Sequence, residues 1–300
     1  MTAHRPLRPG APPLAPPPRR RPRLLLLALA LLCGLATGCA SSGEAATPIV
    51  TLHYAANDNI GAAGSFRPGP VGFNVADIET RAQLDALPAG VVGLIFLGLC
   101  QGADANFQAH IAPFVGAQNL FGFYLVDEPD PAKCPAAHLA AESAFIHAHV
   151  SGARTFVLVQ NLAASAAPSY EGGYNRANTG VDLFGIDPYP CRSELSGCDY
   201  SMIHRYILAA EAFGIPQSAI VPVYQAFGGG EWVDDGGGRY LQPTPAQAIA
   251  IFQEWARFIP HPSFDYVYSW GVQRNDVALG VAPPSLQEVF SAHNRGAPLG

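Results

Sequence analysis

The chain has 300 residues, with 17 basic and 23 acidic side chains and a formal net charge of −6 at pH 7. Six arginines and no acidic residue lie in the first 38 positions, so the remainder carries 11 basic against 23 acidic side chains, a net charge of −12. A surface of this sign repels phosphate backbones, and no arginine cluster follows the N-terminal segment. These features argue against a nucleic-acid partner.

The N-terminal segment is typical of an export signal. An arginine-rich arm leads into an apolar run of 12 residues at 24–35, followed by Ala-Thr-Gly before Cys39. The run is too short to span a membrane, which needs about 20 residues. The small residues before Cys39 resemble the lipobox of bacterial lipoproteins, in which the cysteine carries a lipid anchor. We expect a signal peptide at 1–38, a membrane anchor at Cys39, a linker at 39–48 and an extracytoplasmic location. The alternative is an ordinary secreted protein cleaved nearby.

From residue 49 onward, apolar β-rich runs alternate with helical patterns. Eight strands are predicted, at 49–53, 71–74, 91–99, 120–126, 155–160, 181–186, 220–224 and 264–270. Helices are predicted at 78–87, 106–118, 136–149, 200–213, 245–258 and 286–293, with poorer links at 57–70 and 163–180. This alternation favours parallel strands, and eight units indicate a single-domain α/β fold, a (β/α)8 TIM barrel, over 49–300. An open doubly wound sheet is disfavoured because no glycine-rich phosphate loop follows the first strand.

Four cysteines remain besides Cys39 and the signal-peptide cysteine. An even number in an exported chain favours disulfides, and their positions predict the pairs Cys100–Cys134 and Cys191–Cys198 in loops after predicted strands. The sequence shows no C-x-x-C pair and no His/Cys cluster at ligand spacing, so we expect no structural metal and no cofactor.

Polar and aromatic residues follow most of the predicted strands. In a barrel, the C-terminal ends of the strands meet at one face, where barrel enzymes keep their sites. The residues expected to bind substrate there are His53, Tyr54, Asn74, Asn161, Tyr189, Tyr224, Gln225 and Trp270. A glycine-rich loop after the seventh strand adds Trp232 and Tyr240, which could stack on a sugar ring.

The stretch 121–130 is predicted to be an apolar strand that ends in two acidic residues. Pro129 stops the strand, so Asp127 and Glu128 lie at its C-terminal end. Adjacent strand residues point to opposite faces, so at most one acid should aim into a central site, and we expect this to be Glu128. Alternatively, both acids cap the helix that begins near Pro135.

Three segments resemble those of barrel-type glycoside hydrolases: Tyr-Leu-Val-Asp-Glu-Pro at 124–129, Phe-Gly-Ile-Asp-Pro-Tyr-Pro at 184–190 and Tyr-Val-Tyr-Ser-Trp at 266–270. The resemblance implies that Glu128 is a general acid/base. It also implies that Trp270 forms the floor of the sugar subsite at the cleaved bond.

The chain departs from the pattern of the largest clan of these enzymes, which has a second glutamate where this chain has Gln225. Glycoside cleavage generally needs two carboxylates. Asp187 could be the partner, or Glu231 could enter from the glycine-rich loop. Alternatively, the substrate's own acetamido group could be the nucleophile, oriented by Asp127, as in the hexosaminidase-type barrels that the Asp-Glu pair resembles.

We therefore expect a glycoside hydrolase-like enzyme that acts on O-glycosidic bonds of an extracytoplasmic poly- or oligosaccharide, with Glu128 as acid/base and Asp127 or Asp187 as partner. The second hypothesis is a surface lipoprotein that binds carbohydrate without cleaving it. A serine hydrolase is disfavoured because no Gly-x-Ser-x-Gly motif is present.

Overall fold

A computed structural model of the chain describes residues 51–195, 197–234 and 237–299. The predicted signal peptide, Cys39 and the linker lie outside the described residues. Among the helices that are described, none combines the length and the hydropathy needed to cross a membrane.

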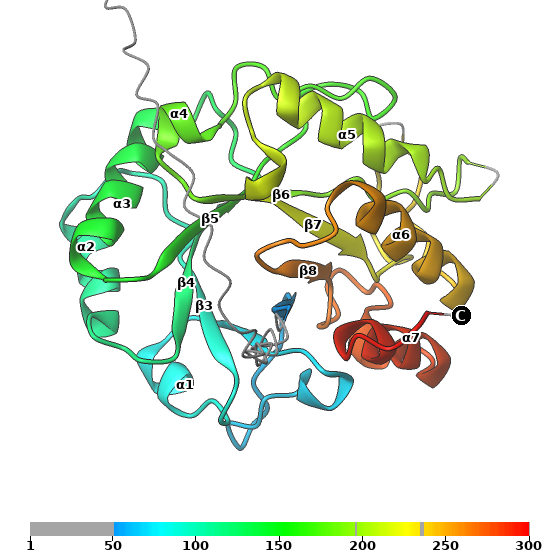
Figure 1. Cartoon of the computed structure of the whole chain (residues 1–300), viewed down its shortest axis with the longest axis horizontal. Coiled ribbons are helices and arrows are strands. Elements are labelled where there is room, and N and C mark those ends of the chain that lie inside the picture. The colour runs from blue at the N-terminus through cyan, green and yellow to red at the C-terminus, as the bar shows by residue number, and fades with distance from the viewer. Residues whose placement is uncertain (1–50, 196, 235–236, 300) are drawn as a thin grey trace, which may run out of the picture. The chain divides into compact units, whose positions relative to one another are not determined.

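Eight parallel strands form a closed barrel in chain order, and β8 pairs with β1 to complete it. The strands are β1 His53–Ala55, β2 Val75–Ile78, β3 Val92–Phe96, β4 Leu120–Asp127, β5 Arg154–Leu158, β6 Leu183–Ile186, β7 Ile220–Gln225 and β8 Asp265–Tyr268. Figure 1 shows the helices ringing this barrel. The prediction of a (β/α)8 barrel is thereby confirmed.

In the part of the chain that the structure describes, seven α-helices surround the strands, with bounds α1 Arg81–Asp85, α2 Ala105–Ile111, α3 Ala136–His149, α4 Arg176–Thr179, α5 Ser201–Ala212, α6 Pro245–Phe258 and α7 Pro284–Asn294. The same residues also contain 3-10 turns at Gly69–Val71, Ala112–Phe114, Gln217–Ala219 and Leu279–Val281. The links that the sequence marked as poor hold only short elements, the turn at Gly69–Val71 after β1 and the four-residue α4 after β5.

The first two strands lie further along the chain than predicted. β1 begins at His53 and β2 begins at Val75, whereas the sequence predicted that strands end at His53 and Asn74. Alanines extend both ladders, because Ala55 pairs with Ala76 of β2 and with Val267 of β8. Alanine has little intrinsic preference for strands, so the pattern of β-formers misplaced these two elements.

Two apolar layers fill the barrel and its surroundings. Alternate residues of β4 separate them: Phe123 and Leu125 join the layer that includes the helices, whereas Tyr124 joins a cluster of strand and loop residues inside the barrel. The inner cluster is rich in aromatic rings, with the Tyr124 and Phe156 ring centroids 4.7 Å apart. The barrel is therefore packed rather than hollow, and a ligand must bind at one of its ends.

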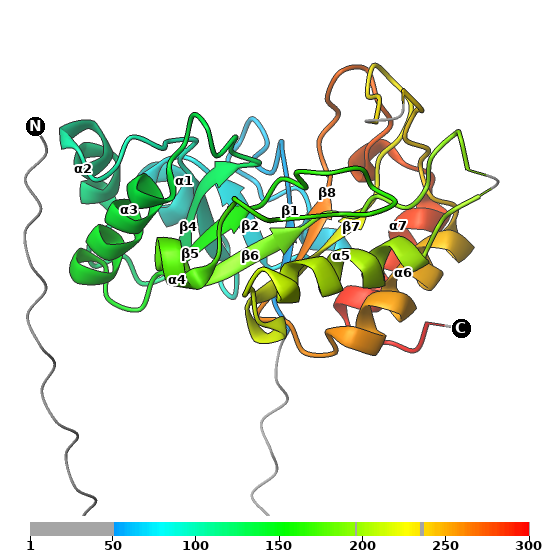
Figure 2. The ribbon, with the colours of Figure 1, turned by 90° about the horizontal axis from the view of Figure 1, so that it is seen from above.

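Both predicted disulfides are present. Cys100–Cys134 joins the loop after β3 to the loop after β4, and Cys191–Cys198 closes the loop after β6. Figure 2 shows the loops after β7 and β8 rising together at one side of the barrel. Backbone hydrogen bonds between Gly228 and Val277 hold these two loops side by side.

Candidate active site

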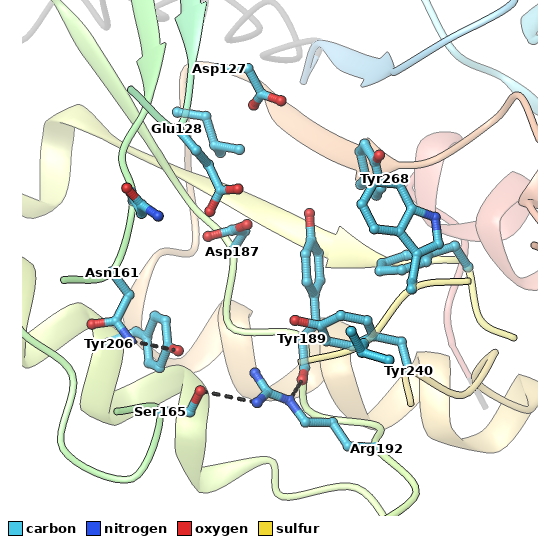
Figure 3. A pocket seen from close by; sticks show the side chains of 15 residues that line it. Asp127, Glu128, Asn161, Ser165, Asp187, Tyr189, Arg192, Tyr206, Tyr240 and Tyr268 are labelled. Atoms are coloured by element: carbon cyan, nitrogen blue, oxygen red, sulfur yellow. Dashed lines mark hydrogen bonds between the residues drawn. The ribbon is translucent and has the colours of Figure 1, made fainter. Parts of the chain in front are cut away.

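A cavity of about 250 Å³ lies at the C-terminal ends of β4 to β8 (Figure 3). Its volume is somewhat below the roughly 300–1,000 Å³ typical of small-molecule sites. Three carboxyl groups line it, from Asp127, Glu128 and Asp187. All three were predicted from the sequence as catalytic residues, and the fold brings them together.

Asp127 and Glu128 both line the cavity, although neighbouring strand residues ordinarily point to opposite faces. The regular strand ends at Asp127, and Glu128 has a φ of +39°, which turns its side chain back toward the cavity. The expectation that at most one acid faces the site was therefore wrong. The alternative of helix capping is contradicted as well, because α3 begins after Pro135 without a side-chain cap.

The Asp127 carboxylate is held from inside the barrel. The Tyr124 hydroxyl donates a hydrogen bond to its Oδ1 over 2.5 Å. Although Asp127 reaches solvent through the cavity, the surrounding protein desolvates the carboxyl and raises its pKa, and the hydrogen bond from Tyr124 opposes that rise. The hydrogen bond fixes where this carboxylate lies relative to the other two.

Asp187 follows β6 and points toward Glu128, as Figure 3 shows. Burial raises the pKa of Asp187 well above its usual range, and repulsion from the Glu128 and Asp127 carboxylates raises it further. Two carboxylates that face each other cannot both ionise at low cost, so their repulsion favours the protonated form of the pair. A carboxyl that is still protonated at neutral pH can act as a general acid.

Aromatic side chains form the opposite wall of the cavity: Tyr189, Phe227, Trp232, Tyr240 and Tyr268. Their rings contact one another, with centroids 5.0 Å apart for Tyr189 and Phe227 and 5.1 Å apart for Phe227 and Tyr268. The Trp232 indole N–H donates to Asp276, which anchors the glycine-rich loop to the loop after β8. Flat apolar faces beside hydrogen-bonding groups suit ligands that are apolar on one face and polar at the edge.

Arg192 lies at the far end of the cavity from the carboxyl groups and is only 5% exposed. Its guanidinium donates to the Tyr189 carbonyl and to the Ser165 hydroxyl. Its Nη1 lies 3.5 Å from the Asp234 carboxylate. The cavity therefore has three carboxyl groups at one end and, at the other, an arginine that is paired with Asp234. Asn161 lines the wall between them, with its amide bonded to the Tyr206 hydroxyl.

Several residues expected in the site lie elsewhere. His53 and Asn74 are at the N-terminal ends of β1 and β2, because those strands begin where they were predicted to end. Tyr224 faces outward from β7 and packs against Phe252 of α6. Tyr54 is buried inside the barrel.

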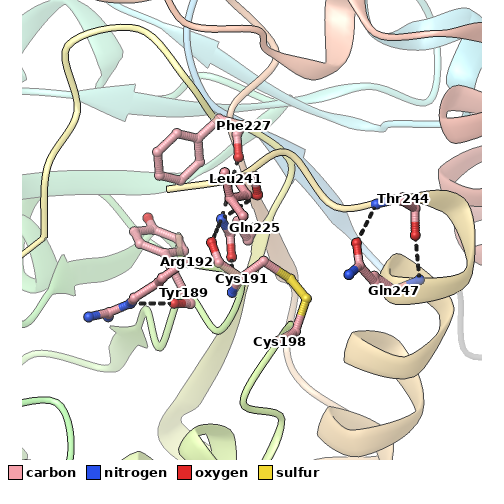
Figure 4. The surroundings of a disulfide bond; sticks show 9 residues. All are labelled: Tyr189, Cys191, Arg192, Cys198, Gln225, Phe227, Leu241, Thr244 and Gln247. Carbon is pink, nitrogen blue, oxygen red and sulfur yellow. Dashed lines mark hydrogen bonds between the residues drawn. A yellow bond between two sulfur atoms is a disulfide. The ribbon is translucent and has the colours of Figure 1, made fainter. Parts of the chain in front are cut away.

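Gln225 and Trp270 do not line the cavity and instead make packing and hydrogen-bond contacts within the fold. The Gln225 amide accepts from the Cys191 N–H and donates to the carbonyls of Cys191 and Leu241 (Figure 4). Trp270 packs edge-on against Phe73. β8 ends at Tyr268, so Tyr268 rather than Trp270 contributes the aromatic ring from this strand.

Sequence reasoning did not identify Arg192, Ser165, Tyr206, Phe227 or Tyr268 as site residues. The alternation of Tyr266 and Tyr268 on β8 was the available signal for Tyr268, since residues two apart share a strand face. Arg192 and Ser165 lie in long loops whose paths no local pattern specifies. Glu231, considered as a partner carboxylate, is not part of the cavity wall, and its Oε1 accepts a hydrogen bond from Asn275.

Comparison with known proteins identifies the fold. No protein-family model and no curated protein sequence matches the chain. Solved structures do match, among them the C-terminal domain of a putative chitinase from Desulfitobacterium hafniense, with a TM-score of 0.50, 11% identity and coverage of 75% of this chain and 92% of that one. A chitinase from Bacteroides thetaiotaomicron also has a TM-score of 0.50 at 11% identity, covering 81% and 96%.

The spore cortex-lytic enzyme SleL from Bacillus megaterium matches with a TM-score of 0.50 and 11% identity over 81% of this chain and 74% of its own. At such low identity these likenesses establish a shared fold. They confirm, at the level of the fold, the resemblance to barrel-type glycoside hydrolases.

Proposed function

We propose that the protein is a glycoside hydrolase that cleaves O-glycosidic bonds of an extracytoplasmic poly- or oligosaccharide. One observation carries the proposal: Asp127, Glu128 and Asp187 converge on a single cavity whose opposite wall is aromatic. Glycoside hydrolysis needs a proton donor and a second carboxylate beside the cleaved bond, and both are available here.

In this proposal Glu128 and Asp187 act as one acidic unit. Repulsion between the two carboxyl groups favours a proton on the pair, and Glu128 delivers that proton to the leaving oxygen as the bond breaks. Asp127, fixed by the Tyr124 hydroxyl, lies where it could stabilise positive charge on the sugar or orient an acetamido substituent.

The aromatic wall supplies binding. Tyr189, Trp232, Tyr240 and Tyr268 present ring faces and edges on which the apolar C–H face of a sugar can pack. Asn161 and Arg192 supply hydrogen-bonding groups beyond them. A sugar seated on the rings would place its glycosidic oxygen toward the carboxyl end of the cavity.

The alternative is a barrel that binds sugar without turnover. It is favoured by Gln225, which stands where the largest clan of related enzymes has a catalytic glutamate. Screening the wild-type protein against α- and β-linked oligosaccharides, N-acetylated ones included, separates the two functions when binding and chain shortening are measured on the same samples. Shortening of a bound sugar supports the hydrolase, whereas binding with no shortening of any sugar supports the binding barrel.

We further infer that Cys39 carries a lipid anchor, since the short apolar run before it cannot hold the protein in a membrane after cleavage. Cys39→Ser should move the protein from the membrane fraction to the soluble fraction. Retention of this variant in the membrane fraction would show that another segment anchors the chain.

A further inference from the structure

A second cluster of chemically active side chains lies at the opposite end of the barrel from the cavity. His53 is the first residue of β1 and Asp265 is the first residue of β8, and the two are paired across the seam where the barrel closes. His293 reaches them from the last helix, α7. The cluster thus joins the first strand, the last strand and the last helix.

Both histidines contact the same carboxylate. His53 Nδ1 lies 2.9 Å from each oxygen of the Asp265 carboxylate, and His293 Nε2 lies 2.9 Å from Oδ2. A single N–H bond prefers to point at one acceptor, so an Nδ1 equidistant from both oxygens is a poor arrangement for one hydrogen bond. The three ligand atoms lie within 4.8 Å of one another, and among the described residues this is the one such group of three or more metal-binding side chains.

The surroundings hold these groups in place. His53 is 4% exposed and Asp265 1% exposed, while the His293 side chain is 20% exposed. The His293 ring stacks on Phe252 with centroids 4.2 Å apart, and Tyr224 packs edge-on against it at 5.3 Å. Fixed rings present their nitrogens at low ordering cost, which favours binding of an ion.

We propose that His53, Asp265 and His293 form a structural binding site for a divalent transition metal, with zinc as the best-suited ion. Imidazole nitrogen and carboxylate oxygen are ordinary zinc ligands, at distances of about 2.0–2.2 Å. Tetrahedral ligands at such distances are about 3.3 Å apart, so the 2.9 Å pairs need to open by a few tenths of an ångström. The ligand atoms of the two histidines, which lie within 4.8 Å of each other, need to move closer together. Solvent beside the partly exposed His293 can supply the fourth ligand.

A metal here would cross-link β1, β8 and α7 where the barrel closes. β1 has only three residues, so the seam has a short ladder. His53 and His293 are 240 positions apart in the sequence, and a bond through one ion would tie nearly the whole barrel into a loop. Bound zinc should therefore raise the thermal stability without entering the reaction at the other end.

The test uses purified protein that has been freed of metal with a chelator. Zinc is then added to the metal-free protein and the excess is removed by dialysis, after which elemental analysis should find one zinc ion per chain. When Co²⁺ is added in place of zinc, we expect visible absorption typical of tetrahedral cobalt. The melting temperature should rise by about 5–10 °C at a zinc concentration about 100 times Kd. The rise should fade below about pH 6, because the imidazole nitrogens must be deprotonated to bind.

His293→Gln is the informative variant, because its amide keeps an N–H close to the position of Nε2 and so preserves the hydrogen bond to Asp265 without offering a metal ligand. It should fold and lose the zinc-dependent rise. His147→Gln is the matched control, since His147 Nε2 makes a similar 2.8 Å contact with Asp182 but has no second histidine. It should keep the rise. The proposal is overturned if wild type shows no zinc-dependent rise, or if His293→Gln shows the same rise and stoichiometry as wild type.

Discussion

The proposed acid catalysis depends on a carboxyl group of the cavity whose pKa is raised. An isolated aspartate would be ionised there and could donate nothing. Burial and the neighbouring carboxylates of Glu128 and Asp127 instead raise the pKa of Asp187 well above its usual range. In the proposed reaction, this rise favours a proton on the pair of Glu128 and Asp187.

Removing the carboxyl of Asp187 should therefore change the pH dependence of the reaction. A raised pKa means that the pair keeps its proton as the pH rises, so wild-type activity should fall only when the pH passes the upper apparent pKa of the pair. Asp187→Asn removes the like charge beside Glu128, and the fall should move to lower pH by about one unit or more. A profile of kcat against pH measures this, and an unshifted basic limb would show that the two carboxyl groups act separately.

At the scale of the elements, β7 shows that a residue at a strand end can hold the loops of the site in place without contacting the cavity. Gln225 is 1% exposed, and its amide links the loop that contains Cys191 to the loop segment at Leu241. Those two segments carry Arg192 and Tyr240 into the cavity wall. Gln225 thus positions both segments through backbone contacts.

Gln225→Glu introduces a carboxylate where the largest glycosidase clan has one, yet it should destabilise the fold. The change removes the N–H groups that donate to two carbonyls and buries a charge, at a cost of about 2–5 kcal/mol in the free energy of unfolding. Urea unfolding measures the loss. Gln118→Glu, at an exposed position, is the control and should be near neutral. A stable Gln225→Glu variant with raised activity would contradict the structural role.

The elements also show how far local patterns determine position. Strands β3 to β8 lie within or near their predicted ranges because continuous Val, Ile, Leu and Phe runs mark strands buried on both faces. The predicted positions of β1 and β2 were wrong because alanines extend these strands. His53 and Asn74 therefore lie at the opposite end of the barrel from the one predicted. The acid pair ending β4 was placed correctly, whereas its double inward orientation depends on the positive φ of Glu128, which the sequence did not signal.

At the scale of the whole molecule, the barrel closes through contacts between residues far apart in the chain. The sequence contained no histidine cluster at ligand spacing, because His53, Asp265 and His293 meet only after the first and last strands pair. Arg192 and Ser165 likewise meet only when the loops after β5 and β6 are in place. Contacts of this kind depend on tertiary structure, so periodicity and motifs could predict the barrel without predicting them.

The seam should also give the protein a specific sensitivity to acid. Burial alone would raise the pKa of Asp265, but hydrogen bonds and charge from His53 and His293 outweigh it and lower the pKa to about 2. A depressed carboxyl pKa contributes stability above the unfolded value near 3.9, and that stability is lost as the pH falls through about 2.

In protein freed of metal, Asp265→Asn should therefore lower the free energy of unfolding by about 2–3 kcal/mol at pH 7 and by progressively less below about pH 4. Urea unfolding across this pH range measures the difference from wild type. Asp85→Asn, at an exposed ion pair with Arg81, should have little effect at any pH. A cost for Asp265→Asn that stays constant with pH would show that the carboxylate charge does not stabilise the seam.

The most direct test of the account compares turnover by Glu128→Gln and wild type on an oligosaccharide that both bind. Gln keeps the shape of the side chain and removes the acidic proton, so the hydrolysis rate should fall by about 10²–10⁴-fold while affinity changes far less. Glu288→Gln, on the exposed face of α7, should match wild type. Wild-type turnover in Glu128→Gln would contradict the assignment of acid catalysis to this cavity.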